Sequence, residues 1–304
     1  MAERHAAAIG ADRPAPNRYG TIPAIGRARH GKGGGMAQIA YGSTQAPAAP
    51  APFVTPERSV RIFLNGELVA VSQGSPYGLA ELAVGYLFSE GVVSDRDRLT
   101  DVVADEAAAE VRVVSGEHAD VLVPLHRVTS AGCARSALLR QAGDAAAPMV
   151  AAGLGHGAPP VLPPLETSAR FAADALLAGM EELCGCSPRR NAGECVHGCG
   201  LGDGRSPRLL LVREDIGRHN AMDKAVGQAW LERLPLHDKA LFVTGRISCE
   251  MALKAHRAGC PVLVSCKSAT DEAVSHAEAL GVTLVSHCRD GFLRVLSHPD
   301  RIPG

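Results

Sequence analysis

The second half of the chain alternates short apolar segments with amphipathic ones, and this alternation limits the possible folds more than any other feature of the sequence. The apolar segments are predicted to be strands: 209–212, 240–243, 262–264, and two more near Thr283 and Leu293. The amphipathic segments are predicted to be helices: 168–183, 218–230, 248–258 and 270–280. Strands that alternate with helices indicate an α/β sheet with helices on both faces.

The region before this alternation has the pattern of a smaller α/β unit. Alternating apolar residues over 58–71, interrupted by Asn65 and Gly66, predict a β-hairpin with a tight turn. Ser75, followed by proline, has the pattern of an N-cap and predicts a helix that Gly91 ends. Two further segments are predicted to be strands: 111–114 and 121–125.

Composition divides the chain into four parts. Residues 1–52 are rich in Ala, Gly, Pro and Arg without hydrophobic periodicity, and they are predicted to be a disordered tail. A second stretch rich in Ala, Gly and Pro, 143–166, is predicted to be a linker. It would join an N-terminal subdomain of residues 53–142 to a C-terminal domain of residues 167–304.

Charge and hydropathy argue against two classes of partner. Lys and Arg together number 31 and Asp and Glu 32, and this net charge of −1 argues against a broad surface for nucleic acid or membrane. The longest apolar runs are too short for a transmembrane helix. Because the N-terminus lacks the pattern of a secretory signal, we expect a cytoplasmic protein. Its nine cysteines are then expected to be core residues, metal ligands or catalytic thiols rather than disulfides.

Two polar turns follow predicted strands and lead into predicted helices. The candidate ligand-binding residues of the first turn are Asp215, Gly217, Arg218, His219, Asn220 and Lys224. Those of the second turn are Thr244, Gly245, Arg246 and Ser248. Helix starts offer N–H groups to anions, and ligands of α/β sheets bind at the carboxyl ends of the strands. The turns therefore predict a nucleotide or phosphate cleft, although neither has a Walker or Rossmann pattern.

Several cysteines are candidate reactive or metal-binding thiols. Cys133 lies among small polar residues after a predicted strand, where Arg135 would favour the thiolate; a buried core cysteine is the alternative. A later set has the spacing C-x-C-x8-C-x-H-x-C, which offers soft ligands for a possible structural zinc but is not the usual paired C-x2-C: Cys184, Cys186, Cys195, His197 and Cys199. The remaining cysteines near the strands and helices are expected to be core residues: Cys249, Cys260 and Cys266.

Six sequence blocks stand out along the chain: LNGE at 64–67, GLAELAVGYLFSEG at 78–91, EDIGRHNAMDK at 214–224, TGRISCEM at 244–251, RAGCPVLVS at 257–265 and HPDRI at 298–302. Taken together and in order, they resemble the FdhD/NarQ family of formate dehydrogenase accessory proteins from about residue 55 to the end of the chain. One block alone would be a weak signal, whereas the ordered set is highly specific.

The resemblance implies a fold, an activity and a cofactor. The fold is a small N-terminal α/β subdomain plus a C-terminal three-layer α/β/α domain of the cytidine-deaminase-like type, in a homodimer. The activity is that of a sulfurtransferase in which a loop cysteine, Cys133 here, takes persulfide sulfur from a cysteine desulfurase. The sulfur passes to the molybdenum bis(molybdopterin guanine dinucleotide) cofactor that formate dehydrogenase needs. The guanine nucleotide would contact the two polar turns and a third loop, with the residues Ser286, His287, Cys288, Arg289, Asp290 and Gly291.

The chain departs from the family pattern at three places. Many members have Cys-Gly-x-Cys in the active loop, whereas Cys133 is the single cysteine here and Ser130 stands at the other position. The usual Thr-Gly-Gly-Val-His block reads Gly-Glu-Cys-Val-His at 193–197, and His287 replaces an aromatic residue of the third loop. The first departure excludes a catalytic cycle based on a disulfide within the loop.

Two other functions stay open on the sequence. A non-catalytic chaperone that binds the molybdenum cofactor fits the polar turns equally well, and only a requirement for Cys133 separates it from a sulfur carrier. A zinc-dependent hydrolase or deaminase would use the cysteine-rich segment and His197. The deaminase signature needs a glutamate two residues after the histidine, where this chain has Cys199, and a Pro-Cys-x-x-Cys motif, which the sequence lacks.

Overall fold

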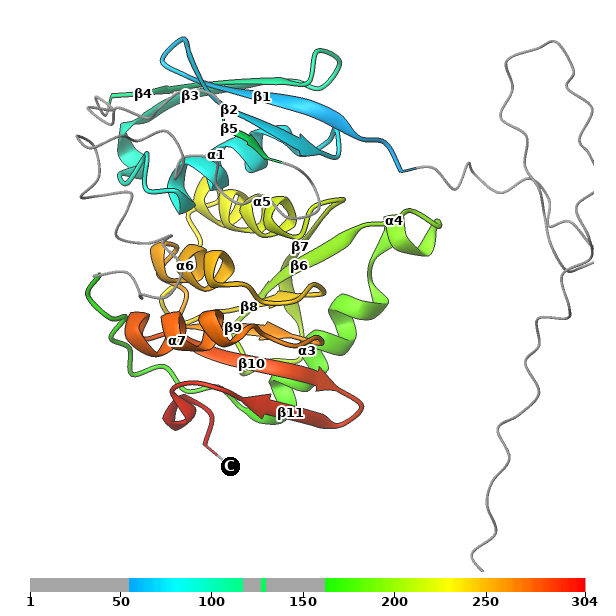
Figure 1. The fold of residues 1–304 in the computed structure, drawn as a ribbon, viewed down its shortest axis with the longest axis vertical. Coiled ribbons are helices and arrows are strands. Elements are labelled where there is room, and N and C mark those ends of the chain that lie inside the picture. Colours follow the sequence, from blue (N-terminus) through cyan, green and yellow to red (C-terminus); the bar gives the residue numbers. More distant parts are fainter. Residues whose placement is uncertain (1–54, 117–126, 130–161, 304) are drawn as a thin grey trace, which may run out of the picture. The chain divides into compact units, whose positions relative to one another are not determined.

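The computed structural model describes residues 55–116, 127–129 and 162–303, which belong to one compact unit, Pro52–Gly304 (Figure 1). The predicted tail, the predicted strand at 121–125 and nearly all of the predicted linker lie outside the described residues.

The N-terminal part is built on a five-stranded sheet with the order β3-β4-β1-β2-β5. Its strands are β1 (Arg58–Leu64), β2 (Glu67–Gly74), β3 (Leu99–Asp105), β4 (Glu110–Ser115) and β5 (Arg127–Thr129). β1 and β2 form the predicted hairpin, in which Asn65 and Gly66 take φ angles of 50° and 88°, as a tight hairpin turn requires. β3 escaped prediction because most of its side chains are exposed, so it has no clear apolar alternation. A 3-10 helix, η1 (Arg96–Arg98), precedes it.

Helix α1 (Leu79–Ser89) ends just before Gly91 as predicted, but it does not begin at Ser75. Its N-cap is Gly78, which has a φ of 61°. The backbone N–H of Ser75 instead donates to Asp215 Oδ2 at 3.1 Å, and the Ser75 hydroxyl accepts from the N–H of Ile216 at 3.2 Å. The predicted helix start was wrong because tertiary hydrogen bonds hold Ser75 in the connection that leads to α1.

The C-terminal part is built on a six-stranded sheet with the order β11-β10-β9-β8-β6-β7. Its strands are β6 (His197–Gly202), β7 (Leu209–Asp215), β8 (Ala240–Val243), β9 (Val262–Ser265), β10 (Thr283–Arg289) and β11 (Phe292–Val295). Its helices are α3 (Ala173–Gly185), α4 (Pro188–Asn191), α5 (Arg218–Leu231), α6 (Cys249–Arg257), α7 (Asp271–Leu280) and the 3-10 helix η3 (Pro299–Arg301). The strands and helices predicted from residue 168 onward are all present; α4 and β6 lie in the cysteine-rich segment, which was predicted to be a loop.

Helices cover both faces of the six-stranded sheet, as the sequence predicted (Figure 1). The alternation of side chains along β8 shows this directly. Leu241 and Val243 belong to one core cluster with residues of α5, α6 and α7. Ala240 and Phe242 belong to another cluster with residues of α3. The result is a three-layer α/β/α arrangement in which β8, β9 and β10 run parallel and β6 runs antiparallel to its two neighbours.

Helices α1 and α5 touch through their backbones. A Cβ atom added to Gly85 of α1 would lie 1.8 Å from the carbonyl oxygen of Asp223, and one added to Gly227 of α5 would lie 1.9 Å from that of Glu81. Any larger residue at these positions would force the helices apart. Trp230 of α5 joins the core of the five-stranded sheet, so α1 and α5 connect the two sheets.

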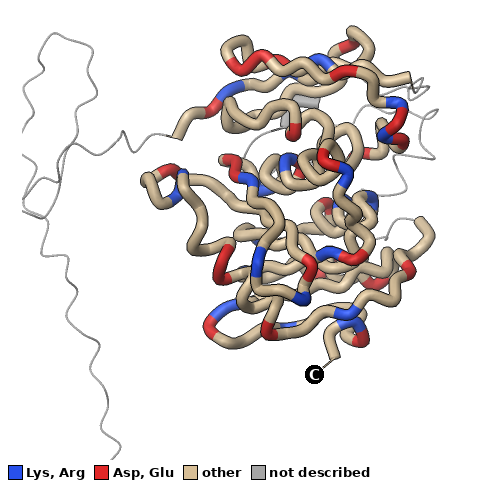
Figure 2. The backbone as a smooth tube through the Cα atoms, turned by 180° about the vertical axis from the view of Figure 1, so that it is seen from behind, with Lys and Arg blue, Asp and Glu red and all other residues tan. Residues whose placement is uncertain are grey.

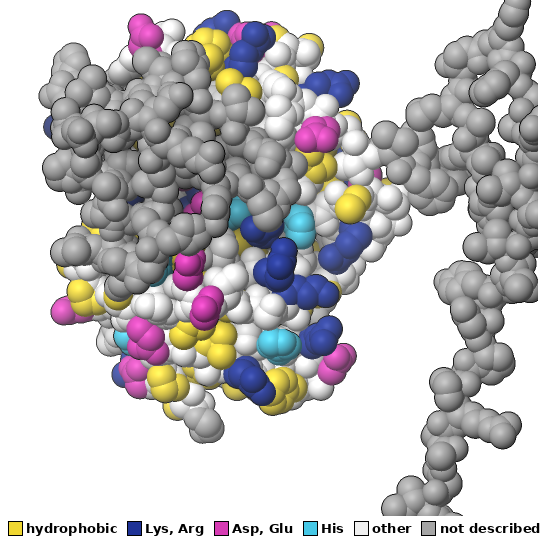
Figure 3. Space-filling model, in the orientation of Figure 1, with side chains coloured by type: hydrophobic (Ala, Val, Ile, Leu, Met, Phe, Trp, Pro, Cys, Tyr) yellow, Lys and Arg dark blue, Asp and Glu magenta, His cyan; other side chains and the backbone are white. Residues whose placement is uncertain are grey.

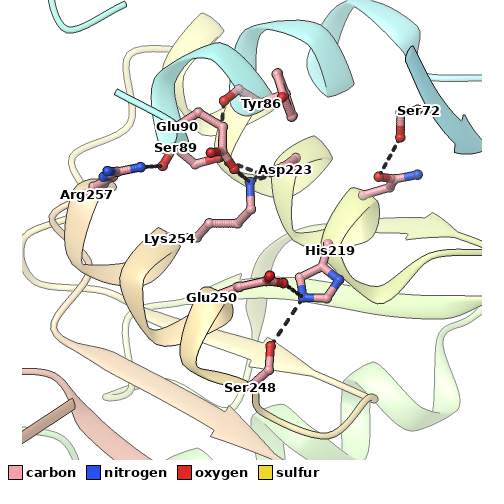
Figure 4. Close-up of polar contacts among 11 residues, drawn as sticks. Ser72, Tyr86, Ser89, Glu90, His219, Asp223, Ser248, Glu250, Lys254 and Arg257 are labelled. Atoms are coloured by element: carbon pink, nitrogen blue, oxygen red, sulfur yellow. Dashed lines mark hydrogen bonds and ion pairs between the residues drawn. The ribbon is translucent and has the colours of Figure 1, made fainter. Parts of the chain in front are cut away.

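A buried ionic cluster ties α6 to the same pair of helices (Figure 4). Lys254 Nζ of α6 lies 2.9 Å from Asp223 Oδ1 on α5 and 3.0 Å from Glu90 Oε1 at the end of α1. It also donates to Ser89 Oγ at 2.9 Å, and the Ser89 hydroxyl donates to Asp223 Oδ1 at 2.6 Å. Three helices therefore meet at one buried ammonium group.

Acidic and basic residues are interspersed along the described backbone, in keeping with the near-zero net charge (Figure 2). None of the helices in the described part of the chain combines the length and the hydropathy of a membrane span.

Candidate functional site

The polar turns predicted from the sequence share one edge of the six-stranded sheet. β8, β9 and β10 run parallel, and β7 has the same direction because β7 and β8 are both antiparallel to β6. The carboxyl ends of β7, β8, β9 and β10 therefore lie at this edge. β6 runs the other way, so it begins at this edge with His197, which pairs with Asp215 at the end of β7. The prediction that polar residues gather at the carboxyl ends of the strands is therefore confirmed for their position in the sheet.

The first and second polar turns lie against each other. His219 Nε2, in the first turn of α5, is 3.2 Å from Ser248 Oγ and 3.2 Å from Glu250 Oε2, which flank the start of α6 (Figure 4). Gly245 sits so close to Arg218 that an added Cβ would lie 3.0 Å from two of its side-chain carbons. The two helix starts therefore open on one shared surface.

The third loop joins this surface through the end of β9. The Ser265 hydroxyl donates to the carbonyl oxygen of Gly245 at 2.6 Å and accepts from the N–H of Lys267 at 2.9 Å. The N–H of His287 donates to the carbonyl oxygen of Lys267 at 3.0 Å. His287 and Asp290 have φ angles of 51° and 53°, so the backbone turns sharply where β10 passes into the third loop. All three polar segments are thus linked along one sheet edge.

Positive charge accumulates at this edge. Its basic residues, at least partly exposed, are Arg218, Arg246, Lys267 and Arg289. Figure 3 shows Lys and Arg side chains gathered beside His side chains on the visible face. Gly217 precedes α5 and has no side chain for capping, and Ser248 makes no side-chain cap to α6 within the described chain. Uncapped helix starts together with basic side chains favour an anionic ligand such as a phosphate group.

Three predicted ligand-binding residues of the first turn instead hold the protein together. Lys224 Nζ lies 2.6 Å from Asp215 Oδ2, and both side chains are at most 1% exposed. Burial lowers the pKa of Lys224, while the Asp215 carboxylate opposes that shift. The buried Asn220 amide donates to the carbonyl oxygen of Gln73 and accepts from the Ser72 hydroxyl. These partners belong to the chain itself, so the predicted contact of Asp215, Asn220 and Lys224 with a ligand is corrected.

Cys288 is a second correction. The third-loop pattern placed it on the ligand side, but its side chain is fully buried in the core cluster beneath α3. Its thiol faces the carbonyl oxygen of Leu176 at 3.6 Å, and burial raises its pKa to about 12. A β-bulge between Ser286 and Arg289 shifts the side-chain alternation that a regular strand would have kept.

Cys133 lies outside the described residues, as does Ser130. The described chain before them ends with β5, where Thr129 pairs with Ser72 of β2. The Ser72 hydroxyl donates to Asn220 Oδ1 at 3.0 Å, and Asn220 is in the first turn of α5. The end of β5 is therefore connected, through Ser72, to the helix start that carries Arg218 and His219.

The cysteine-rich segment does not bring its candidate zinc ligands together. Cys184, Cys186 and Cys195 are exposed, whereas Cys199 is fully buried within β6. Across residues 55–116, 127–129 and 162–303, no group of three or more His, Cys, Asp or Glu side chains is arranged to hold a metal ion. The described residues thus give no support to the zinc-dependent hydrolase.

His197 lies at the sheet edge that carries the polar turns. The sequence pattern made it a candidate zinc ligand, but in the structure it stands between the two polar turns. It lies close to Gly245: a Cβ atom added to that glycine would be 3.3 Å from His197 Nδ1. Burial lowers its pKa, and the neighbouring positive charge of Arg218 and the nearby His219 lower it further. The signal was lost because β6 has three glycines in six residues, which strand prediction penalises.

Comparisons with known proteins agree with this architecture. The sequence pattern of the FdhD/NarQ family matches residues 55–303. The sulfur carrier protein FdhD of Xanthomonas axonopodis pv. citri is 32% identical over 249 residues, which cover 82% of this chain and 85% of that protein. The sulfur carrier protein FdhD of Bacillus subtilis is 30% identical over 248 residues, 81% of this chain and 88% of that protein.

A solved structure shares the fold. It is a protein from Desulfotalea psychrophila described as a candidate formate dehydrogenase accessory protein, with a TM-score of 0.61, 24% sequence identity, and coverage of 82% of this chain and 89% of that one. The family pattern spans both sheets and all three polar segments of the sheet edge. The chain therefore belongs to the FdhD/NarQ family.

Proposed function

We propose that this protein is a sulfur carrier required for formate dehydrogenase activity, and that it works as a cytoplasmic homodimer. Cys133 accepts persulfide sulfur from a cysteine desulfurase and passes it to the molybdenum bis(molybdopterin guanine dinucleotide) cofactor, which is cargo. The observation that carries the proposal is the meeting of three polar segments, distant in sequence, at one basic sheet edge beside the end of β5. The names of the Xanthomonas and Bacillus relatives support the same role.

Chain length supports a sulfur acceptor near the end of β5. Three residues lie between Thr129, the last residue of β5, and Cys133, so four Cα–Cα steps join the two. An extended chain spans at most about 3.6 Å per residue, which limits the separation of the two Cα atoms to about 14 Å. Since β5 is connected to the start of α5 through Ser72, sulfur and cargo can be brought together within one protein.

The sulfur-accepting step needs only a thiolate and a persulfide. The Cys133 thiolate attacks the outer sulfur of the desulfurase persulfide, a new sulfur–sulfur bond forms, and the bond to the desulfurase cysteine breaks. The desulfurase cysteine leaves as a thiolate, so no external oxidant or reductant is consumed. Arg135, two residues along the chain, provides positive charge that favours the Cys133 thiolate.

The sheet edge supplies the chemistry for a guanine nucleotide. Arg218, Arg246 and Arg289 offer guanidinium groups, and the starts of α5 and α6 offer backbone N–H groups, to phosphate oxygens. Guanine presents N–H donors on its pairing edge, and a carboxylate can accept hydrogen bonds from them. Adenine does not present the same set of donors on that edge. The carboxylate of Asp290 in the third loop is 91% exposed and therefore available for this contact.

Mass spectrometry tests the sulfur-carrier proposal directly. The protein is incubated with a cysteine desulfurase and cysteine, and the peptides are then analysed without reduction. We expect the mass of one added sulfur atom on the peptide that contains Cys133. If Cys133 gained no sulfur while the protein still bound the cofactor, the chaperone would be the correct function.

Nucleotide binding tests the assignment of the sheet edge. Calorimetry should detect GDP binding and much weaker ADP binding. Arg246→Ala should weaken GDP binding about 10-fold, because a charged hydrogen bond contributes roughly 1.5–3 kcal/mol. Arg58→Ala is the matched control, because Arg58 is also exposed but lies on β1 of the other sheet. Equal binding of GDP and ADP, or equal effects of the two substitutions, would count against the assignment.

A further inference from the structure

The side chain of Asn220 joins the end of β2 to the start of α5. Asn220 is in the first turn of α5 and is 8% exposed. Its amide nitrogen donates to the carbonyl oxygen of Gln73 on β2 at 2.9 Å, and its amide oxygen accepts from the Ser72 hydroxyl at 3.0 Å (Figure 4). One amide therefore fixes β2 against the helix start through two hydrogen bonds.

The carboxylate of Asp215, at the end of β7, holds the same amide from another side. Its Oδ1 atom accepts from the Asn220 amide nitrogen at 3.1 Å and from the N–H of Gly217 at 2.9 Å. Its Oδ2 atom accepts from the N–H of Ser75 at 3.1 Å and pairs with Lys224 Nζ at 2.6 Å. Because Asp215 is fully buried, bulk water does not compete for these bonds. The carboxylate and the amide thus form one buried network between β2, β7 and α5.

Close packing leaves the amide little freedom. A Cβ atom added to Gly74, the last residue of β2, would lie 2.7 Å from Asn220 Nδ2 and 3.3 Å from Asp215 Oδ2. An amide suits this place because its nitrogen can donate to two acceptors while its oxygen accepts from a hydroxyl. A carboxylate of the same shape has no N–H to donate, and it would stand beside the charge of Asp215. The connection therefore depends on the chemistry of an asparagine side chain.

The network lies between the two parts of the molecule that the proposed function uses. Ser72, its member on β2, pairs with Thr129, the last residue of β5, and Cys133 follows β5 in the sequence. At the other end, Arg218 lies two residues before Asn220 in α5 and belongs to the basic sheet edge. The network is therefore a direct hydrogen-bonded connection from β5 to the edge assigned to the nucleotide.

We propose that Asn220 is a positioning residue for sulfur delivery: it holds the strand that precedes Cys133 in place relative to the edge that binds the cargo nucleotide. The inference rests on the proposed function. Sulfur loading requires an accessible thiolate, and nucleotide binding requires the basic edge, whereas delivery requires that both are held at a fixed separation. A displacement of about 1 Å between reacting groups can slow a reaction about 100-fold. Loss of Asn220 should therefore affect delivery and spare the two separate steps.

Three measurements on Asn220→Ala separate positioning from a general loss of structure. After incubation with a cysteine desulfurase and cysteine, mass spectrometry should find wild-type amounts of added sulfur on Cys133. Calorimetry should find unchanged GDP affinity, because the bond from the N–H of Gly217 to Asp215 still holds the start of α5. Activation of formate dehydrogenase in a strain without its own carrier should fall about 10-fold or more. Wild-type activation, or a comparable loss of sulfur loading or GDP binding, would overturn the proposal.

Ser72→Ala tests the same connection with a smaller change. It removes only the hydroxyl that donates to Asn220, so the loss of activation should be smaller while sulfur loading and GDP binding again stay unchanged. The double variant should activate no less than Asn220→Ala alone, because Ser72 acts through Asn220. Additive losses would mean that the two side chains act separately, and they would overturn the proposed network.

Asn65→Gly is the matched control. The Asn65 amide also uses both ends, donating to the carbonyl oxygen of Ser115 at 3.0 Å and accepting from the N–H of Ser115 at 2.9 Å. It joins β4 to the turn between β1 and β2, within one sheet, and glycine retains the positive φ of that turn. All three measurements should match the wild type. An equal loss of activation in Asn65→Gly would overturn the specific role of Asn220.

The wild-type protein, measured alongside, distinguishes this inference from the proposed function. Absence of added sulfur on Cys133 of the wild type would refute the sulfur carrier and the positioning role together. A wild type that gains sulfur, next to an Asn220→Ala variant that activates formate dehydrogenase normally, would refute the positioning role alone.

Discussion

Replacing Cys133 by alanine is expected to abolish the activation of formate dehydrogenase. Alanine has no sulfur to which the transferred atom can bond, so the loss should reach the level of a strain without the protein. The measurement is formate dehydrogenase activity in a strain that lacks its own carrier and expresses the variant. Circular dichroism should show an unchanged fold, since the substitution only removes a thiol.

Cys186→Ala is the matched control for this experiment. Cys186 is exposed, lies in the cysteine-rich segment and has no role in the proposed transfer, so full activation is expected. If Cys133→Ala retained full activity, the protein would bind and deliver the cofactor without moving sulfur. If Cys186→Ala lost activity while its fold was intact, sulfur would have to pass through the cysteine-rich segment.

Replacing Lys254 by methionine is expected to lower the free energy of unfolding by about 3–5 kcal/mol, the usual effect of breaking a buried ion pair. The variant leaves the carboxylates of Asp223 and Glu90 close together in a buried place without the ammonium group between them. Urea unfolding measures the change. Lys267→Met is the matched control: Lys267 is exposed, and its substitution should change stability by less than about 0.5 kcal/mol.

The pH dependence of the Lys254→Met variant gives an independent check. Burial raises the pKa of Asp223 even in the native protein, where Lys254 opposes the shift. Without Lys254 the folded-state pKa rises further above the unfolded value, so the folded protein binds protons more tightly than the unfolded chain. The stability deficit should therefore be smaller at pH 5 than at pH 7. A deficit independent of pH would mean that lost packing, rather than unpaired charge, destabilises the variant.

Most of the fold was predictable because the strongest patterns come from fully buried elements. The limits of β8 were predicted to the residue, since all four of its side chains are buried and polar residues follow it directly. β6 was missed because most of its buried positions are glycines, which give no apolar pattern in the sequence. Glycine is needed there because neighbouring side chains pack against the backbone and leave little room for a Cβ atom. Adding a Cβ to Gly200, for example, would bring it 2.8 Å from Leu209.

The candidate site was predictable as a location but not residue by residue. Polar residues that follow apolar strands indicate where the carboxyl edge of the sheet lies. They do not indicate which atoms each of these side chains contacts. The sequence does not show that Asp215 and Lys224 pair with each other inside the protein. It also does not show that both side chains bond to the backbone of Ser75, which lies in the distant connection before α1.

The contact of α1 with α5 at Gly85 and Gly227 has a consequence for cooperativity. Helices whose backbones touch cannot separate by a small side-chain adjustment. α1 forms the core of the five-stranded sheet, and α5 packs on the six-stranded sheet, so separating these helices exposes both cores at once. The two sheets therefore open as a single unfolding unit. The most protected amide hydrogens of β1 and β9 then exchange with solvent at rates set by the same global opening, although they lie in different sheets.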